Sequence, residues 1–233
     1  METHSKKSSG NSSMSQPDKS KRPFRDFAYI RFWFFATLGF LVGTLGLAWF
    51  FYNGEYKFWH YYISDLGRIH IVGNSSITNL TSRIIFSVGL GICGVSALIM
   101  AQLYFRHPLK SRLTKTKGIL LILLAVGAVL IGFPIDGQHP NVHRIGAALF
   151  FINFDLYIFF CQFTRVKQKQ ISFDTGEGKS LTFEKLVVII LFVWTITYLI
   201  LIIIDLAEIL PAVQKINVLL FLTAALMLDK EDF

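Results

Sequence analysis

Long runs without a charged residue alternate with polar segments along the chain. Four of these runs cover residues 32–54, 84–105, 118–135 and 186–204. Each reaches the length of roughly 18 apolar residues that a helix needs to cross the hydrocarbon core of a bilayer. The pattern therefore predicts four transmembrane helices.

Two less uniform segments raise this number to six. The segment 144–163 is interrupted only by Asp155, and the short apolar run 216–228 reaches nearly full length when it is extended back to Pro211, with Lys215 snorkelling to the interface. We therefore predict an all-α, polytopic membrane helix bundle, with five helices and a re-entrant tail as the alternative. The transmembrane domain spans residues 29–228, and its six helices are expected at about 30–52, 84–105, 118–134, 143–163, 186–205 and 211–228.

Polar segments lie at the two ends of the chain. Residues 1–28 are rich in Ser and Lys and almost free of aliphatic side chains. This composition predicts a disordered leader, and the full-length apolar run that follows it argues against a cleavable signal peptide. Residues 229–233 form a short polar tail.

The positions of the basic residues predict the orientation. In the six-helix arrangement, 18 of the 23 Lys and Arg residues lie on one side, in the leader, the segments 106–117 and 164–185, and the tail. Cytoplasmic loops are enriched in Lys and Arg, so the N- and C-termini are both predicted to be cytoplasmic. The other face carries five basic and five acidic residues, so the net charge of +8 mainly reflects orientation.

The composition excludes several classes of protein. Hydrophobic residues make up 53% of the chain and charged residues 16%, with a mean hydropathy of +0.51. A soluble domain usually contains about 25% charged residues. We therefore exclude a soluble enzyme, a disordered protein and a disulfide-rich secreted domain. We expect a multi-pass integral protein of the cell membrane that binds no nucleic acid, and the sequence leaves its oligomeric state open.

Glycines recur within two of the predicted helices. Residues 89–94 match the dinucleotide-binding pattern G-x-G-x-x-G, but they lie inside a predicted transmembrane helix instead of between a strand and a helix. We interpret these glycines, and the pair Gly39 and Gly43, as sites of close helix packing.

Polar residues suited to chemistry gather in the outward-facing segments. Four His and five acidic residues fall there: His60, His70, His139, His143, Glu55, Asp65, Asp136, Asp205 and Glu208. Such side chains bind divalent metals or form acid–base pairs. Asp136, His139 and His143 are the candidate metal ligands, because the two His are four residues apart and would share a helical face. Since the spacing fixes no third ligand, we favour a polar pocket without metal, or ordinary loop structure, and expect no cofactor.

Asn153 and Asp155 lie at membrane depth in the predicted fourth helix. An ionisable side chain at the bilayer centre costs at least about 2.5 kcal/mol, so it normally faces the bundle interior. We favour an inter-helix hydrogen bond by Asp155 over a role in proton transfer, with Gln102, Tyr157 and Gln162 as candidate partners.

Three sequons for N-glycosylation occur, at Asn11, Asn74 and Asn79. In the predicted orientation Asn74 and Asn79 face outward, and Asn79 lies close to the membrane. Asn11 would face the cytoplasm and remain unmodified.

Several short motifs occur in a characteristic order. Residues 62–67 read YISDLG before the second helix, residues 132–136 read GFPID after the third, and His143 and Glu208 open the fourth helix and the last hairpin. This set resembles the six-span DUF998 family, and more remotely the Frag1/DRAM/Sfk1 group. The resemblance covers about residues 30–228, although the turn 131–134 and the segment 139–143 depart somewhat from the family pattern.

The resemblance implies architecture more than activity. DUF998 has no assigned activity, whereas its distant relatives are linked to lipid-related processes in membranes. By analogy, the outward polar cluster would be a lipid headgroup site. The residues assigned to this site are Ser64, Asp65, Arg68, Asp136, His143 and Glu208.

Three functions compete. We favour a non-enzymatic protein that interacts with membrane lipids, which predicts an open lateral groove lined by Phe and Tyr. The alternative is a metal-assisted intramembrane hydrolase, with His139 and His143 as ligands and Asp65 or Asp136 as third ligand or base. A small transporter that uses Asp155 is the weaker alternative, because the sequence shows no internal repeat.

Overall fold

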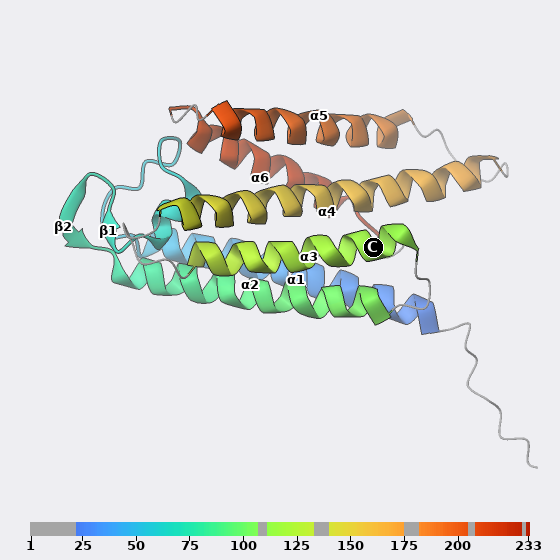
Figure 1. The fold of residues 1–233 in the computed structure, drawn as a ribbon, viewed down its shortest axis with the longest axis horizontal. Helices are drawn as coiled ribbons and strands as arrows, with labels where there is room; N and C mark the ends of the chain where they lie inside the picture. The colour runs from blue at the N-terminus through green and yellow to red at the C-terminus, as the bar shows by residue number, and fades with distance from the viewer. Residues whose placement is uncertain (1–21, 107–110, 133–139, 175–181, 205–207, 230–231) are drawn as a thin grey trace, which may run out of the picture.

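The computed structural model describes residues 22–106, 111–132, 140–174, 182–204, 208–229 and 232–233. Within them the fold is a bundle of α-helices with a small two-stranded sheet at one end (Figure 1). The helices are α1 (Arg22–Phe50), α2 (Leu80–Arg106), α3 (Arg112–Gly132), α4 (Pro140–Asp174), α5 (Thr182–Ile204) and α6 (Leu210–Leu226). Between α1 and α2 lie the 3₁₀ helix η2 (Ile63–Gly67) and the antiparallel strands β1 (His70–Ile71) and β2 (Asn74–Thr78). The predicted all-α, polytopic bundle is confirmed.

Five helices, α1 to α5, are long and apolar enough to cross a membrane. The protein is therefore a multi-pass membrane protein. The remaining helix, α6, is apolar but has 17 residues, which gives a length of about 26 Å against a hydrocarbon core of about 30 Å. A sixth crossing by α6 stays a prediction. The largest difference in bounds is at α4, which continues past residue 163 to Asp174, because the polar segment after Phe163 is rich in helix-forming Lys and Gln.

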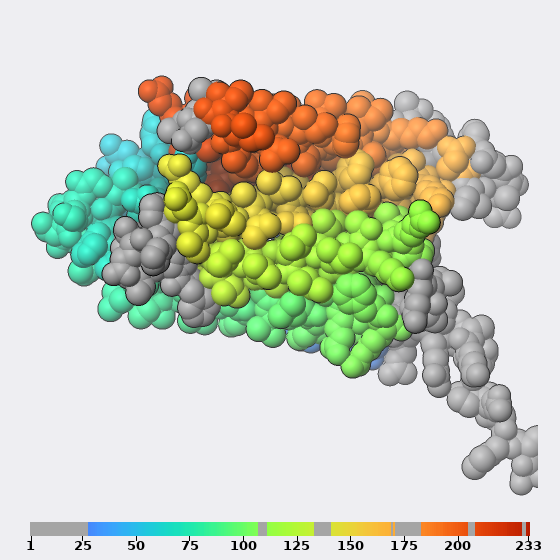
Figure 2. Space-filling view, in the orientation of Figure 1, coloured from blue at the N-terminus to red at the C-terminus, as the bar shows by residue number. Residues whose placement is uncertain are grey.

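Helices that follow one another in the chain pack side by side. α1 packs on α2, α2 on α3 and α3 on α4, while α5 and α6 pack on α4 and on each other (Figure 1). Figure 2 shows α2, α3, α4 and α5 as successive bands across one face of the molecule. Much of the surface of α5 is apolar and exposed, as expected for a helix that faces lipid.

Glycines allow close approach at two helix interfaces, but not where Gly39 and Gly43 lie. A Cβ on Gly89 of α2 would overlap the side chain of Thr44 in α1, and one on Gly127 of α3 would press on the backbone of Phe150 in α4. A Cβ at Gly39 or Gly43 would meet no described atom within 4 Å. The packing role predicted for this pair is therefore wrong, because both glycines lie on the side of α1 that faces away from its neighbours.

The two ends of the bundle differ in composition. One end carries η2, the β1–β2 hairpin and the first residues of α2, α4 and α6 (Figure 1). At the other end lie the start of α1, the end of α2, the start of α3 and residues 232–233. The basic residues Arg106, Arg112 and Arg165 lie at this end as well. The positive-inside rule would place this second end in the cytoplasm.

The last residues of the sequence are held inside this second end. The Lys117 ammonium of α3 is buried and donates to the carbonyl oxygens of Asp232, at 2.6 Å, and Phe233, at 2.9 Å. The Asp232 carboxylate lies 3.6 Å from Arg165 of α4. The ring of Phe233 packs on Phe34 of α1, with centroids 5.1 Å apart. The segment thereby connects α1, α3 and α4.

Glycosylation mapping tests the predicted orientation. Asn74 is exposed on β2, whereas Asn79 is buried and donates to the carbonyls of Leu66 and Arg68. In endoplasmic-reticulum microsomes we expect one added glycan, lost in Asn74→Gln and retained in Asn79→Gln, because only the exposed amide can be modified. The measurement is the glycosidase-sensitive mobility shift. Loss of the glycan in Asn11→Gln, with no effect of Asn74→Gln, would reverse the orientation.

Candidate functional site

The polar residues predicted in the first outward segment are organised by η2. The Asp65 carboxylate is 4% exposed. One of its oxygens accepts from the Tyr62 backbone N–H at 2.7 Å, and the other lies 2.8 Å from the Arg68 Nε. Burial raises the pKa of the Asp65 carboxyl, while the Arg68 guanidinium and the Tyr62 N–H oppose that rise. Asp65 and Arg68 are thus brought together, and they hold the turn in shape.

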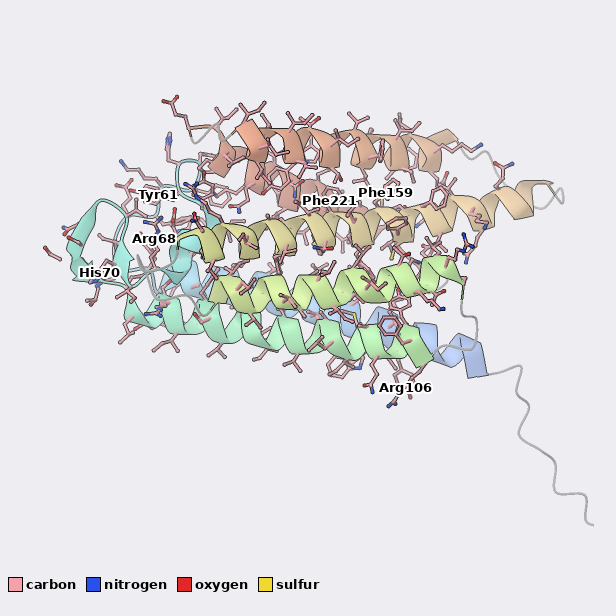
Figure 3. All side chains as sticks on the ribbon, viewed as in Figure 1. Tyr61, Arg68, His70, Arg106, Phe159 and Phe221 are labelled. Carbon is pink, nitrogen blue, oxygen red and sulfur yellow. The ribbon has the colours of Figure 1, made fainter. Side chains whose placement is uncertain are left out.

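Two side chains of α6 form hydrogen bonds with η2 and with the residues just before it. The side-chain oxygen of Gln214 accepts from the Ile63 N–H at 3.0 Å. The ammonium of Lys215 donates to the carbonyl oxygens of Tyr61 and, at 3.2 Å, Pro211. Figure 3 places Tyr61 and Arg68 at the same end of the bundle as the hairpin residue His70.

Lys215 is buried within the protein at the η2 end of α6. Its side chain is 2% exposed, and the ammonium lies over the rings of Phe58, at 5.2 Å, and Tyr56, at 5.9 Å. Two backbone carbonyls and two aromatic faces provide a local environment for the cation. Because the Tyr61 carbonyl belongs to the outward segment, an interfacial position of this ammonium stays a prediction.

A lateral groove of about 340 Å³ opens beside Lys215. It runs along α1 from Trp49 to Leu38, and Val42, Trp49 and Leu219 on its walls are half or more exposed at the surface of the bundle. Its aromatic lining comprises Trp49, Tyr56, Phe58, Phe86, Phe150, Phe151 and Phe154. Its polar lining is confined to Ser64 and Lys215 at the η2 end. A groove with these walls is the feature expected of a lipid-interacting protein.

The other residues predicted for the head-group site lie in different parts of the chain. His143 is half-buried in the first turn of α4 and interacts electrostatically with Asp65. Glu208 is exposed just before α6. Asp136 and His139 lie outside the described residues, so the metal site and the hydrolase that depend on them stay predictions. Among the residues that the structure does describe, no group of three His, Cys, Asp or Glu is placed to hold a metal.

Asp155 makes the inter-helix hydrogen bond that the sequence favoured. It is fully buried in α4, and both carboxylate oxygens accept from the Asn217 amide of α6, at 3.0 and 3.1 Å. The Asn217 oxygen in turn accepts from the Trp194 indole of α5 at 2.8 Å. Three helices therefore meet at one polar cluster within the membrane.

The sequence had proposed other partners for Asp155. Gln162 instead donates to the Ala224 carbonyl of α6 at 2.6 Å, and the Tyr157 hydroxyl bonds to that of Tyr104 at 3.1 Å. The buried amide of Asn153 donates to Leu149 of its own helix. The sequence does show Asn217 as an amide inside the last apolar run. It does not identify Asn217 as the partner of Asp155, because the periodicity of one helix does not tell which residue of another helix it faces.

Removing the amide tests this cluster. Asn217→Leu leaves the Asp155 carboxyl without its described donor, and a buried acceptor in that state costs about 1–3 kcal/mol, or more if charged. We expect a lower thermal unfolding midpoint in detergent for Asn217→Leu, and partial recovery in the double variant Asp155→Leu with Asn217→Leu. A double variant less stable than the single one would contradict this explanation.

Comparison with known proteins identifies one family. The family described as "Protein of unknown function (DUF998)" matches residues 34–228. This range includes η2, the groove, and the Asp155–Asn217 cluster. No curated protein and no solved structure matches the chain. The match covers most of the 233 residues, so the chain belongs to the DUF998 family.

Proposed function

We propose that this membrane protein binds a membrane lipid, with an acyl chain in the groove between α1 and α6 and the head group beside Ser64 and Lys215. The observation that carries the proposal is the groove itself. Its walls are apolar, it opens to the side of the bundle, and its polar lining lies at one end. An amphiphile with one polar end has the same distribution of properties.

The length of the groove supports a lipid of a single leaflet. The wall from Leu38 to Trp49 covers eleven residue steps on α1, which correspond to about 16 Å along a helix. Half of a hydrocarbon core is about 15 Å. In the predicted orientation the polar end faces outward, so the outer leaflet supplies the lipid.

The end of the groove has the composition of a membrane interface. Trp49 and Phe58 are exposed and lie against each other, with ring centroids 5.6 Å apart, and Tyr56 packs beside Trp49 at 6.2 Å. Trp and Tyr concentrate at the level of lipid head groups. This arrangement supports a head group at the level of η2.

Shape and polar contacts, more than hydrophobicity, would select the lipid. A chain that moves from bilayer to groove leaves one apolar environment for another, so little hydrophobic free energy is gained. Affinity therefore depends on how closely the walls fit the chain and on what the polar end contacts. This favours a specific lipid over bulk lipid.

Filling the groove tests the proposal. Gly46 lines it, and a Cβ there would meet no described atom within 4 Å, so the side chain of Gly46→Leu has open space where it begins. We expect Gly46→Leu to lose most of the lipid that copurifies with the wild-type protein, measured by native mass spectrometry.

The matched control is Gly43→Leu. Gly43 lies one turn away on the same helix, also with open space at its Cβ, and it is not part of the groove lining. This variant makes the same change in volume and helix propensity. Equal lipid retention by Gly46→Leu and Gly43→Leu would refute the proposed function.

A further inference from the structure

We infer that the lipid bound in the groove carries a net negative charge, recognised by Lys215. This inference rests on the proposed function and adds the chemical class of the ligand. It starts from a cation that lines an apolar groove and is 2% exposed. A buried charge is costly unless it is paired and hydrogen-bonded.

The described hydrogen bonds of Lys215 account for two of its three donors. An ammonium has three N–H groups. The carbonyls of Tyr61 and Pro211 accept two of them, and no other acceptor occurs among the residues described. Since Lys215 lines the groove, a group that enters from there can approach the side chain that carries the third N–H.

The charges around Lys215 do not cancel. Asp65 is the acidic group that acts on it, but the Asp65 oxygens are occupied by Arg68 and by the Tyr62 N–H. No carboxylate of the described chain forms an ion pair with Lys215 within 4.0 Å. The aromatic faces and carbonyls that surround the ammonium are neutral, and His143 faces the same Asp65 carboxylate. Among Asp65, Arg68 and Lys215, one positive charge therefore remains in excess at the head of the groove.

An anionic lipid would neutralise this excess. A phosphate oxygen or a carboxylate oxygen can accept the third N–H as a charge-assisted hydrogen bond. A zwitterionic lipid brings its own cation to a site that already has surplus positive charge, and its attraction is correspondingly weaker. The shared chemistry is an anionic oxygen group attached to an alkyl chain, as in phosphatidylglycerol or a free fatty acid.

The experiment compares lipids on the purified full chain in a neutral detergent. Phosphatidylglycerol, phosphatidylcholine and palmitate are titrated separately, and bound lipid is measured by native mass spectrometry. We expect at least one anionic ligand to bind about tenfold tighter than phosphatidylcholine, which equals about 1.4 kcal/mol. Phosphatidylglycerol and palmitate distinguish a phospholipid head group from a free carboxylate.

Variants at Lys215 test whether that residue recognises the negative charge of the lipid. In Lys215→Gln the ratio of the affinities for anionic lipid and for phosphatidylcholine should fall close to one, because an amide can still donate to a carbonyl but has no charge. Lys215→Arg should keep the preference. The control is Lys57→Gln, which removes an exposed Lys from the same end of the bundle and should also keep it.

The outcomes separate this inference from the proposed function. Equal binding of all three lipids by the wild type, with loss of all three in Gly46→Leu, overturns the anionic ligand and leaves the groove as the binding site. An anionic preference that survives Lys215→Gln also overturns the inference. If Lys215→Gln does not fold, a pH titration of the wild type decides, because the preference should disappear when Lys215 loses its proton while the lipid anion keeps its charge. A preference that persists at alkaline pH counts against Lys215 as the determinant.

Discussion

Polar groups inside a bilayer must find their partners within the protein, and this constraint determines how α6 is held. Hydrocarbon offers no hydrogen-bond donor or acceptor to replace a missing one. In the middle of α6, Asn217 donates to Asp155, and near its end the Ala224 carbonyl accepts from Gln162. Near its start, Gln214 and Lys215 bond to the backbone of Ile63 and Tyr61, in η2 and just before it. A short helix with little length to spare is thereby fixed at its middle and at both ends.

The buried polar contact of Asn217 and the groove involve different sides of α6. The side of α6 with Asn217, Phe221 and Ala224 is buried against α4 and α5, and Figure 3 shows Phe221 between α4 and α6. The opposite side, with Val218 and Leu222, lines the space towards α1. The bond of Asn217 to Asp155 and the groove beside α1 therefore lie on different sides of α6.

The sequence predicted helices well and contacts between them poorly. Charge-free runs locate the helices because a bilayer excludes charge over a defined length. The partner of Asp155 and the burial of Lys215 could not be derived, since both depend on which helix faces which. Asp65 and Arg68 were predicted as members of a head-group site, but their ion pair and its role in shaping η2 depend on backbone geometry. The groove has no local pattern, because its lining comes from six separate segments.

The contact between Lys117 and the last residues also has a consequence for biogenesis. The two carbonyls that accept from Lys117 lie 115 and 116 residues further along the chain. During synthesis, α3 therefore enters the membrane long before those acceptors leave the ribosome. Until then its ammonium has to be solvated by other groups. The Lys117 contacts therefore form late in synthesis, after α4, α5 and α6 have all been made.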